Sequence, residues 1–206
     1  MSSGLEIGAV LLYQCGIMKI KKFRALTDKS WLNLFEIDYM DKSGRSRTWQ
    51  LVSRAATPKC MTGAFDRPDA VLMVPYHTGL KKLAVIREYR VALADYQYEF
   101  PAGLLDKGET VEQAARRELK EETGLDLTKV TRHSPAVYNT AGLADESVSI
   151  VFCECDGQPS TTGNEGSEEI YVQLLTPVDA GRLLASGHAK FDAKCWLILN
   201  HFAAVP

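Results

Sequence analysis

The feature that most constrains the fold is a helical segment enclosed by strand-like segments. Residues 111–123, VEQAARRELKEET, are rich in strong helix formers, and Gly124 is a natural helix end. Apolar and polar alternation and apolar runs predict strands at 31–39, 45–54, 70–76, 82–90, 127–138, 146–155 and 169–175. Two further helices are predicted near 178–186 and 190–203. Because strands and helices do not alternate in a βαβαβ rhythm, the pattern predicts an α+β fold.

Composition narrows the functional classes. The chain has 206 residues, 46% of them hydrophobic, which suits one domain or one domain with a modest appendage. Its 24 Lys and Arg residues face 26 Asp and Glu residues, so no basic excess favours nucleic acid as a partner. The apolar run at 7–13 is too short to span a membrane, and no basic residue precedes it as in a signal peptide. Residues 1–17 are expected to be an upstream extension, because Met18 begins a segment that reads as a start.

The cysteines do not form a disulfide framework. Five is an odd number, and their spacing is irregular. Cys153 and Cys155 lie two apart in an apolar segment, so on a strand they would share one face as buried free thiols. A metal site is the alternative, but no second Cys or His pair accompanies them. A reducing, cytoplasmic location is therefore expected.

Carboxylates crowd one side of the predicted helix. Glu118 lies three residues before Glu121 and four before Glu122, and such spacings bring side chains together. Like charges there repel, and a divalent cation reverses that cost by bridging carboxylate and phosphate oxygens. Arg117 can hold one carboxylate in orientation by a two-bond contact. This spacing alone is more typical of a solvated acidic helix face.

The complete pattern from Gly103 to Leu125 resembles the Nudix box, Gly-x5-Glu-x7-Arg-Glu-U-x-Glu-Glu-x-Gly-U, where U is aliphatic. All nine specified positions match. The resemblance implies an α/β/α sandwich around a mixed central sheet, with the box as loop–helix–loop. It also implies an enzyme that hydrolyses nucleoside diphosphates linked to another moiety, with Mg²⁺ or Mn²⁺. Glu118, Glu122 and the carbonyl of Ala102 would be the metal ligands.

Segments outside the box resemble the ADP-ribose/ADP-sugar pyrophosphatase branch of that family. They are EFPAG at 99–103, SPAVYNTAGLADES at 134–147 and the N-terminal hairpin, with Trp31 on its first strand and Trp49 on its second. The resemblance implies a homodimer that swaps a hairpin subdomain, residues 1–57, while 58–206 form the Nudix domain. The two tryptophans would sandwich the adenine from different subunits. The alternative for each is a core or interface position.

The same resemblance assigns the other substrate contacts. Arg54 and Arg90 would bind the diphosphate or the terminal ribose, and Leu104 would pack near the substrate. The alternative for each arginine is a surface position on a strand. Gln50 stands where a carboxylate often contacts the adenine edge, and Ala141 stands where a proline is usual. These departures leave another nucleoside diphosphate sugar, such as GDP-mannose, as an alternative substrate.

The implied reaction is attack of water at phosphorus, which gives AMP and a sugar phosphate. Arg117 and Glu121 would assist, and a loop after the box would supply a further catalytic carboxylate. That loop, 156–169, offers Glu165, Glu168 and Glu169, and alignment on EEIYV favours Glu168. A ligand-sensing Nudix domain is an alternative, but such domains often lose box glutamates that this chain keeps. Nucleoside triphosphate hydrolysis is less expected, because those enzymes generally lack the hairpin.

Overall fold

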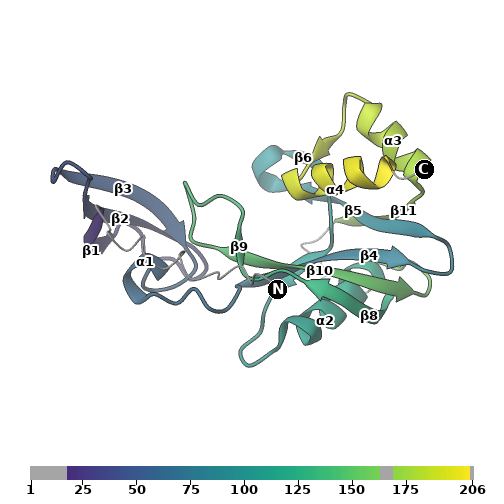
Figure 1. Cartoon of the computed structure of the whole chain (residues 1–206), viewed down its shortest axis with the longest axis horizontal. Coiled ribbons are helices and arrows are strands. Elements are labelled where there is room, and N and C mark those ends of the chain that lie inside the picture. Colours follow the sequence, from purple (N-terminus) through teal and green to yellow (C-terminus); the bar gives the residue numbers. More distant parts are fainter. Residues whose placement is uncertain (1–17, 163–168, 205–206) are drawn as a thin grey trace, which may run out of the picture. The chain divides into compact units, whose positions relative to one another are not determined.

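The computed structural model describes residues 18–162 and 169–204 (Figure 1). The chain forms two compact units, Met1–Asp66 with Tyr138–Glu146, and Arg67–Val137 with Ser147–Pro206, which we call the first and the second unit. None of the helices in the described ranges is long and apolar enough to cross a bilayer. The predicted domain boundary after residue 57 stays a prediction.

The first unit is built on an antiparallel sheet with the order β1-β2-β3. Its strands are β1 (Lys19–Ala25), β2 (Asn33–Met40) and β3 (Ser46–Ser53), and the short helix α1 (Lys59–Thr62) follows. The predicted hairpin is confirmed as β2 and β3, joined by a turn in which Asp41 Oδ1 accepts from the amides of Ser43 and Arg45 at 2.9 and 3.0 Å.

Strand β1 was not predicted, because its residues KIKKFRA lack a clear apolar alternation and are mostly exposed. Phe23 packs β1 against the core, since its ring centroid lies 6.0 Å from that of the buried Phe35. A strand held mainly by backbone pairing to β2 carries little sequence signal of its own.

The second unit contains a mixed sheet. Its strands are β4 (Ala70–His77), β5 (Lys82–Arg90), β6 (Asp95–Glu99), β7 (Ala102–Leu104), β8 (Asp126–His133), β10 (Ser147–Asp156), β11 (Ile170–Leu175) and β12 (Lys190–Phe191). The order along the sheet is β12-β6-β5-β4-β10-β8, with β11 beside β5 and β7 beside β4. Strand β10 runs parallel to β4 and β12 parallel to β6, while the other pairs are antiparallel.

Helices cover both faces of this sheet (Figure 1). Helix α2 (Val111–Thr123) packs on one face, and α3 (Pro177–Ala185) with α4 (Ala193–Ala203) on the other. Successive residues of β4 face opposite ways, since Val71 and Met73 join the cluster under α2 while Leu72 and Val74 join the cluster under α4. The expected α/β/α sandwich in an α+β chain is thereby confirmed.

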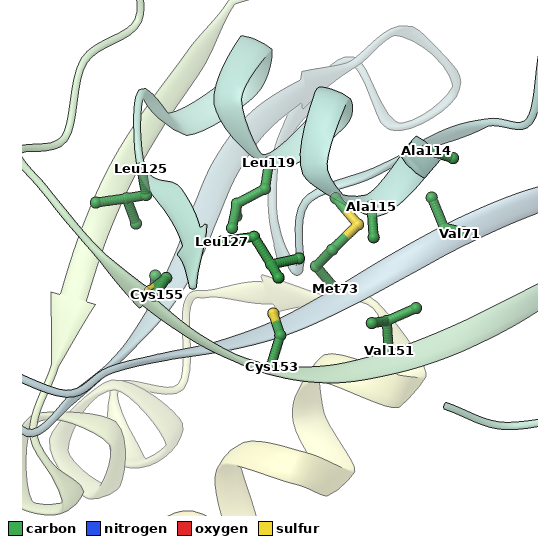
Figure 2. Close-up of a cluster of buried hydrophobic side chains, with 11 residues drawn as sticks. Val71, Met73, Ala114, Ala115, Leu119, Leu125, Leu127, Val151, Cys153 and Cys155 are labelled. Atoms are coloured by element: carbon green, nitrogen blue, oxygen red, sulfur yellow. The ribbon is translucent and has the colours of Figure 1, made fainter. Parts of the chain in front are cut away.

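The cluster under α2 contains two of the thiols (Figure 2). Cys153 and Cys155 are buried, free and on the same face of β10, as the sequence predicted. Burial raises the pKa of each thiol to about 12. They are core residues, which removes the reason to read the pair as a metal site.

Several short elements differ from the prediction. The strand expected over 127–138 is divided into β8 and β9 (Val137–Tyr138), and a 3₁₀ turn at Val91–Leu93 leads into β6. Strands β6 and β7 lie outside the predicted strands, and β12 lies at the start of a predicted helix. They are two to five residues long, which is too short to establish a periodic pattern.

Candidate functional site

Helix α2 begins and ends where the sequence predicts. Thr110 forms a capping box with Gln113: the Thr110 hydroxyl accepts from the Gln113 amide at 3.3 Å, and Gln113 Oε1 accepts from the Thr110 amide at 2.9 Å. Gly124, at φ +71°, ends the helix in the left-handed region. Ala115 and Leu119 anchor one side of α2 to the sheet, which fixes the rotation of its acidic side.

Arg117 is the hub of that acidic side. Its Nε and Nη2 donate to the two oxygens of Glu109 at 3.0 and 2.9 Å. Nη1 donates to Glu118 at 2.8 Å and to Glu121 at 3.2 Å, and Nη2 also donates to the carbonyl of Leu104 at 3.1 Å. The bond from Arg117 lowers the pKa of Glu109, and the bond to Glu109 raises the pKa of Arg117. The expected two-bond contact therefore exists, but its partner is Glu109.

Glu118 lies directly against Gly103. A Cβ at residue 103 would stand 1.9 Å from Cδ of Glu118 and 2.0 and 2.3 Å from its two oxygens. Only glycine leaves room for this carboxylate. Burial raises the pKa of Glu118, and this effect outweighs the opposing hydrogen bond from Arg117.

Glu122 meets β7 one residue earlier. The carbonyl of Pro101 accepts from the Met73 amide of β4 at 2.8 Å. Ladder positions alternate along an antiparallel pair, so Ala102 is a non-hydrogen-bonded position whose amide and carbonyl both face away from β4. That amide donates to Oε2 of the buried Glu122 at 3.0 Å. Glu118 and Glu122 thus converge on adjacent residues of β7, and the Ala102 carbonyl lies on the same edge.

These carboxylates are engaged by the protein itself. Within residues 18–162 and 169–204, no three His, Cys, Asp or Glu side chains are gathered so that they could hold a metal ion. Arg117 draws Glu118 and Glu121 together, while the backbone of β7 holds Glu122. The donor types are nevertheless carboxylate and carbonyl oxygens, which hard divalent cations prefer.

Arg90, at the end of β5, is clamped by two carboxylates that the sequence reasoning missed. Nε and Nη2 of Arg90 donate to Glu99 at 2.8 and 2.7 Å, and Nη1 donates to Glu88 at 2.7 Å. Both glutamates are buried. Burial alone would lower the pKa of Arg90, but its bonds to Glu99 and the charges of Glu99, Glu88 and Glu122 raise it. The sequence feature that could have indicated them is the position of Glu88 and Glu99 near the ends of strand-forming segments.

The first unit carries the two tryptophans on its surface. Trp31 is 76% exposed and Trp49 is 50% exposed, so neither is a core residue of this chain. Trp31 precedes β2, which corrects the expectation that it lies on the strand. The side chain of Asn33 closes a turn back to Lys29 with bonds of 2.7 Å in each direction, and the strand begins only there.

Gln50 follows Trp49 on β3 but faces the other way. The register places Trp49 opposite Ile37 and Gln50 opposite Glu36. A base stacked on the Trp49 ring would therefore not lie on the face that carries the Gln50 side chain.

Arg54 is paired within the first unit. Its Nε donates to Glu146 at 2.6 Å. The segment that contains Ala141 is tied to the end of β3, since the amide of Val52 donates to the carbonyl of Leu143 at 2.8 Å. The family resemblance over residues 134–147 drew attention to this segment, but it did not predict that Glu146 would pair with Arg54.

Of the three glutamates in the 156–169 loop, only Glu169 lies in the described part of the chain. It accepts hydrogen bonds from the hydroxyls of Tyr96 and Tyr171, which also lower its pKa. Strand alternation places both tyrosines on the face opposite α2. Glu169 is therefore held away from the carboxylates of α2, while Glu165 and Glu168 lie outside the described residues.

Comparison with known proteins agrees with this geometry. The model of the NUDIX domain family matches residues 66–195. An ADP-sugar pyrophosphatase of Mus musculus is 31% identical over 201 residues, with 88% of this chain and 87% of that protein covered. An ADP-ribose pyrophosphatase of Bacillus subtilis is 36% identical over 129 residues, with 62% of this chain and 68% of that protein covered.

A solved structure supports the fold. The crystal structure of an ADP compounds hydrolase superposes with a TM-score of 0.67 over 89% of this chain and 92% of that one, at 23% identity. The family match covers the sheet, the box and the helix that carries its glutamates. The chain thus has a complete Nudix box, and its α2 carboxylates lie against Gly103 and Ala102 of β7. Together with the family match over residues 66–195, this shows that the chain belongs to the Nudix family.

Proposed function

We propose that the protein hydrolyses the diphosphate of ADP-ribose or a related ADP-sugar, giving AMP and a sugar phosphate. The observation that carries the proposal is the convergence of Glu118 and Glu122 on Gly103 and Ala102. The names of the Mus musculus and Bacillus subtilis relatives support ADP-sugars as the substrate class.

Nudix hydrolases generally need a divalent cation, and Mg²⁺ or Mn²⁺ fits the donor types here. Glu118, Glu122 and the carbonyl of Ala102 would hold it. When bound, the cation would neutralise charge on the diphosphate and support ionisation of the attacking water. Cation binding would compete with Arg117 for the Glu118 carboxylate, because Arg117 Nη1 already donates to it at 2.8 Å.

The remaining polar groups would contact the attacking water or orient the carboxylates. Glu121 has half of its side chain exposed, so it can reach a water that approaches the site. Glu168 would act as a second carboxylate at the attacking water. Arg117 would hold Glu118 and Glu121 in orientation while it remains anchored to Glu109.

Two subunits of a homodimer would contribute to substrate binding. Trp31 and Trp49 would stack on the adenine, and their exposure suits such a role in a homodimer. Arg54 and Arg90 would bind the diphosphate or terminal ribose, and Leu104 would pack nearby. The Gln50 side chain lies on the other face of β3 from Trp49, so it would not contact a base stacked on that ring. The location would be cytoplasmic, as the free thiols in the described chain suggest.

A second candidate substrate is another nucleoside diphosphate sugar such as GDP-mannose. Two observations favour it: Gln50 replaces a carboxylate, and Ala141 replaces a proline. The deciding experiment is a panel of nucleoside diphosphate sugars with Mg²⁺ or Mn²⁺ and identified products. AMP from ADP-ribose at the highest kcat/KM supports the proposal, and preference for a guanine or uracil nucleotide refutes the assignment to ADP-sugars.

The loop carboxylate and the dimer have their own tests. Glu168→Gln should lower kcat with little change in KM, and Glu165→Gln much less so. The reverse result transfers the role to Glu165. Light scattering at micromolar concentration should give the mass of a dimer, and a fully active monomer would contradict the shared site.

A further inference from the structure

Arg90 is held in an asymmetric environment. Its own side chain is 40% exposed, while the side chains of Glu88 and Glu99 are 11% and 9% exposed. The two acids are thus largely withdrawn from solvent, whereas part of the Arg90 side chain stays exposed.

This arrangement lies on the α2 face of the sheet. Side chains alternate along β5, and Ala84 packs in the cluster under α2, so Glu88 and Arg90 face the same way. Glu99 of β6 lies opposite Ile86, which is also on this face. The charge of Glu122 acts on Arg90 as well, which places the guanidinium within electrostatic reach of the α2 carboxylates.

The hydrogen bonds leave part of the guanidinium available. An arginine carries five N–H groups in a fixed plane. The fork to Glu99 uses two of them and the bond to Glu88 uses a third. Among the described residues, the other two N–H groups have no further hydrogen-bond partner. Because the Glu99 fork fixes the plane, it also fixes the direction of those two donors.

The geometry points to Glu99 as a positioning residue for substrate binding: through its fork it presets the Arg90 guanidinium to receive a diphosphate oxygen. This inference rests on the proposed function. Glu88 supports the same orientation through one bond from Nη1. Without the fork, Arg90 has several rotatable bonds and must be ordered when the ligand binds, which weakens binding.

The test is the binding of ADP-ribose in EDTA, measured by calorimetry so that no turnover intervenes. Glu99→Gln should raise Kd about tenfold, because a charge-assisted contact to a phosphate is lost or misaligned. In an Arg90→Gln background the same change should raise Kd less than twofold, because Glu99 acts only through Arg90. The matched control is Glu112→Gln, which removes the exposed ion pair to Arg116 on α2 and should leave Kd within twofold.

The other possible results of this test distinguish failure of the inference from failure of the proposed function. Equal losses from Glu99→Gln in both backgrounds, or no loss in either, overturn the inference. If Glu99→Gln does not fold, Glu99→Asp keeps the charge but shortens the reach, and its effect must likewise vanish in the Arg90→Gln background. Wild-type binding without hydrolysis in Mg²⁺ refutes the proposed function and leaves this test valid. Failure of the wild type to bind ADP-ribose overturns the inference.

Discussion

We expect the substitution Gly103→Ala to lower the catalytic rate much more than it lowers the free energy of unfolding. The new Cβ would stand 1.9 Å from Cδ of Glu118, whereas real Cβ contacts essentially never fall below 3.0 Å. The carboxylate must therefore move by about 1 Å or more, and such a displacement at a reacting centre typically lowers the rate about 100-fold. We expect kcat for ADP-ribose at saturating Mg²⁺ to fall by about this factor.

The free energy of unfolding should change far less. The displaced Glu118 loses a bond from Arg117, worth about 1.5–3 kcal/mol for a charged group. The Arg117 side chain is 31% exposed, so solvent offsets part of this loss. Replacing glycine by alanine also stabilises the fold by about 0.4–1 kcal/mol, because alanine lowers the conformational entropy of the unfolded chain. The net loss is about 1 kcal/mol, or about 2–4 °C in Tm for a domain of this size.

The assay combines steady-state kinetics with calorimetric melting. The matched control is Gly181→Ala on α3, where the nearest atom to the new Cβ is Cβ of Ala203 at 3.9 Å. It should keep wild-type kcat and be slightly more stable, since alanine is the better helix former. Wild-type kcat in Gly103→Ala would refute the assignment of Glu118 to the catalytic centre.

Three further predictions follow from the same structure. Arg117 lowers the pKa of Glu109 below its usual value near 4.5, so this pair stabilises the fold above that value and loses its effect as the pH falls through the lowered pKa. The Tm difference between wild type and Glu109→Gln should therefore be larger at pH 7 than at pH 2, and an equal difference at both would contradict the pairing. Cys153 and Cys155, with pKa values of about 12, should resist alkylation in the folded protein at pH 8 and react after denaturation, as peptide mass spectrometry can show. Thr110→Ala should remove the cap of α2 and lower stability by about 1 kcal/mol in denaturant melts, whereas Thr110→Ser should retain it.

Sequence reasoning predicted the fold most reliably where a pattern is long or chemically distinct. Helix α2 has the predicted bounds because helix formers fill residues 111–123 and Gly124 supplies the left-handed end. Strands such as β7, with three residues, take their conformation from pairing with β4, which no local pattern encodes.

The candidate site divides in the same way. The box predicted that Glu118 and Glu122 would lie together, because helical spacing alone brings them to one side. It did not reveal that Arg117 forks to Glu109, which depends on the path of the loop before α2. Nor did it reveal that Glu88 and Glu99 clamp Arg90, which depends on strand register. Nor did it reveal that Trp49 and Gln50 face opposite sides of β3, although strand alternation contains that information.

The most direct test of the account compares wild type and Glu122→Gln across a Mg²⁺ titration with ADP-ribose as substrate. A glutamine oxygen can still accept the Ala102 amide, which donates to Glu122 at 3.0 Å, so the variant should fold normally. The wild type should release AMP and ribose 5-phosphate only with the cation, and Glu122→Gln should lose about 1,000-fold or more in kcat/KM at every Mg²⁺ concentration. Near-wild-type turnover in the folded variant would contradict the assignment of the α2 carboxylates to the cation.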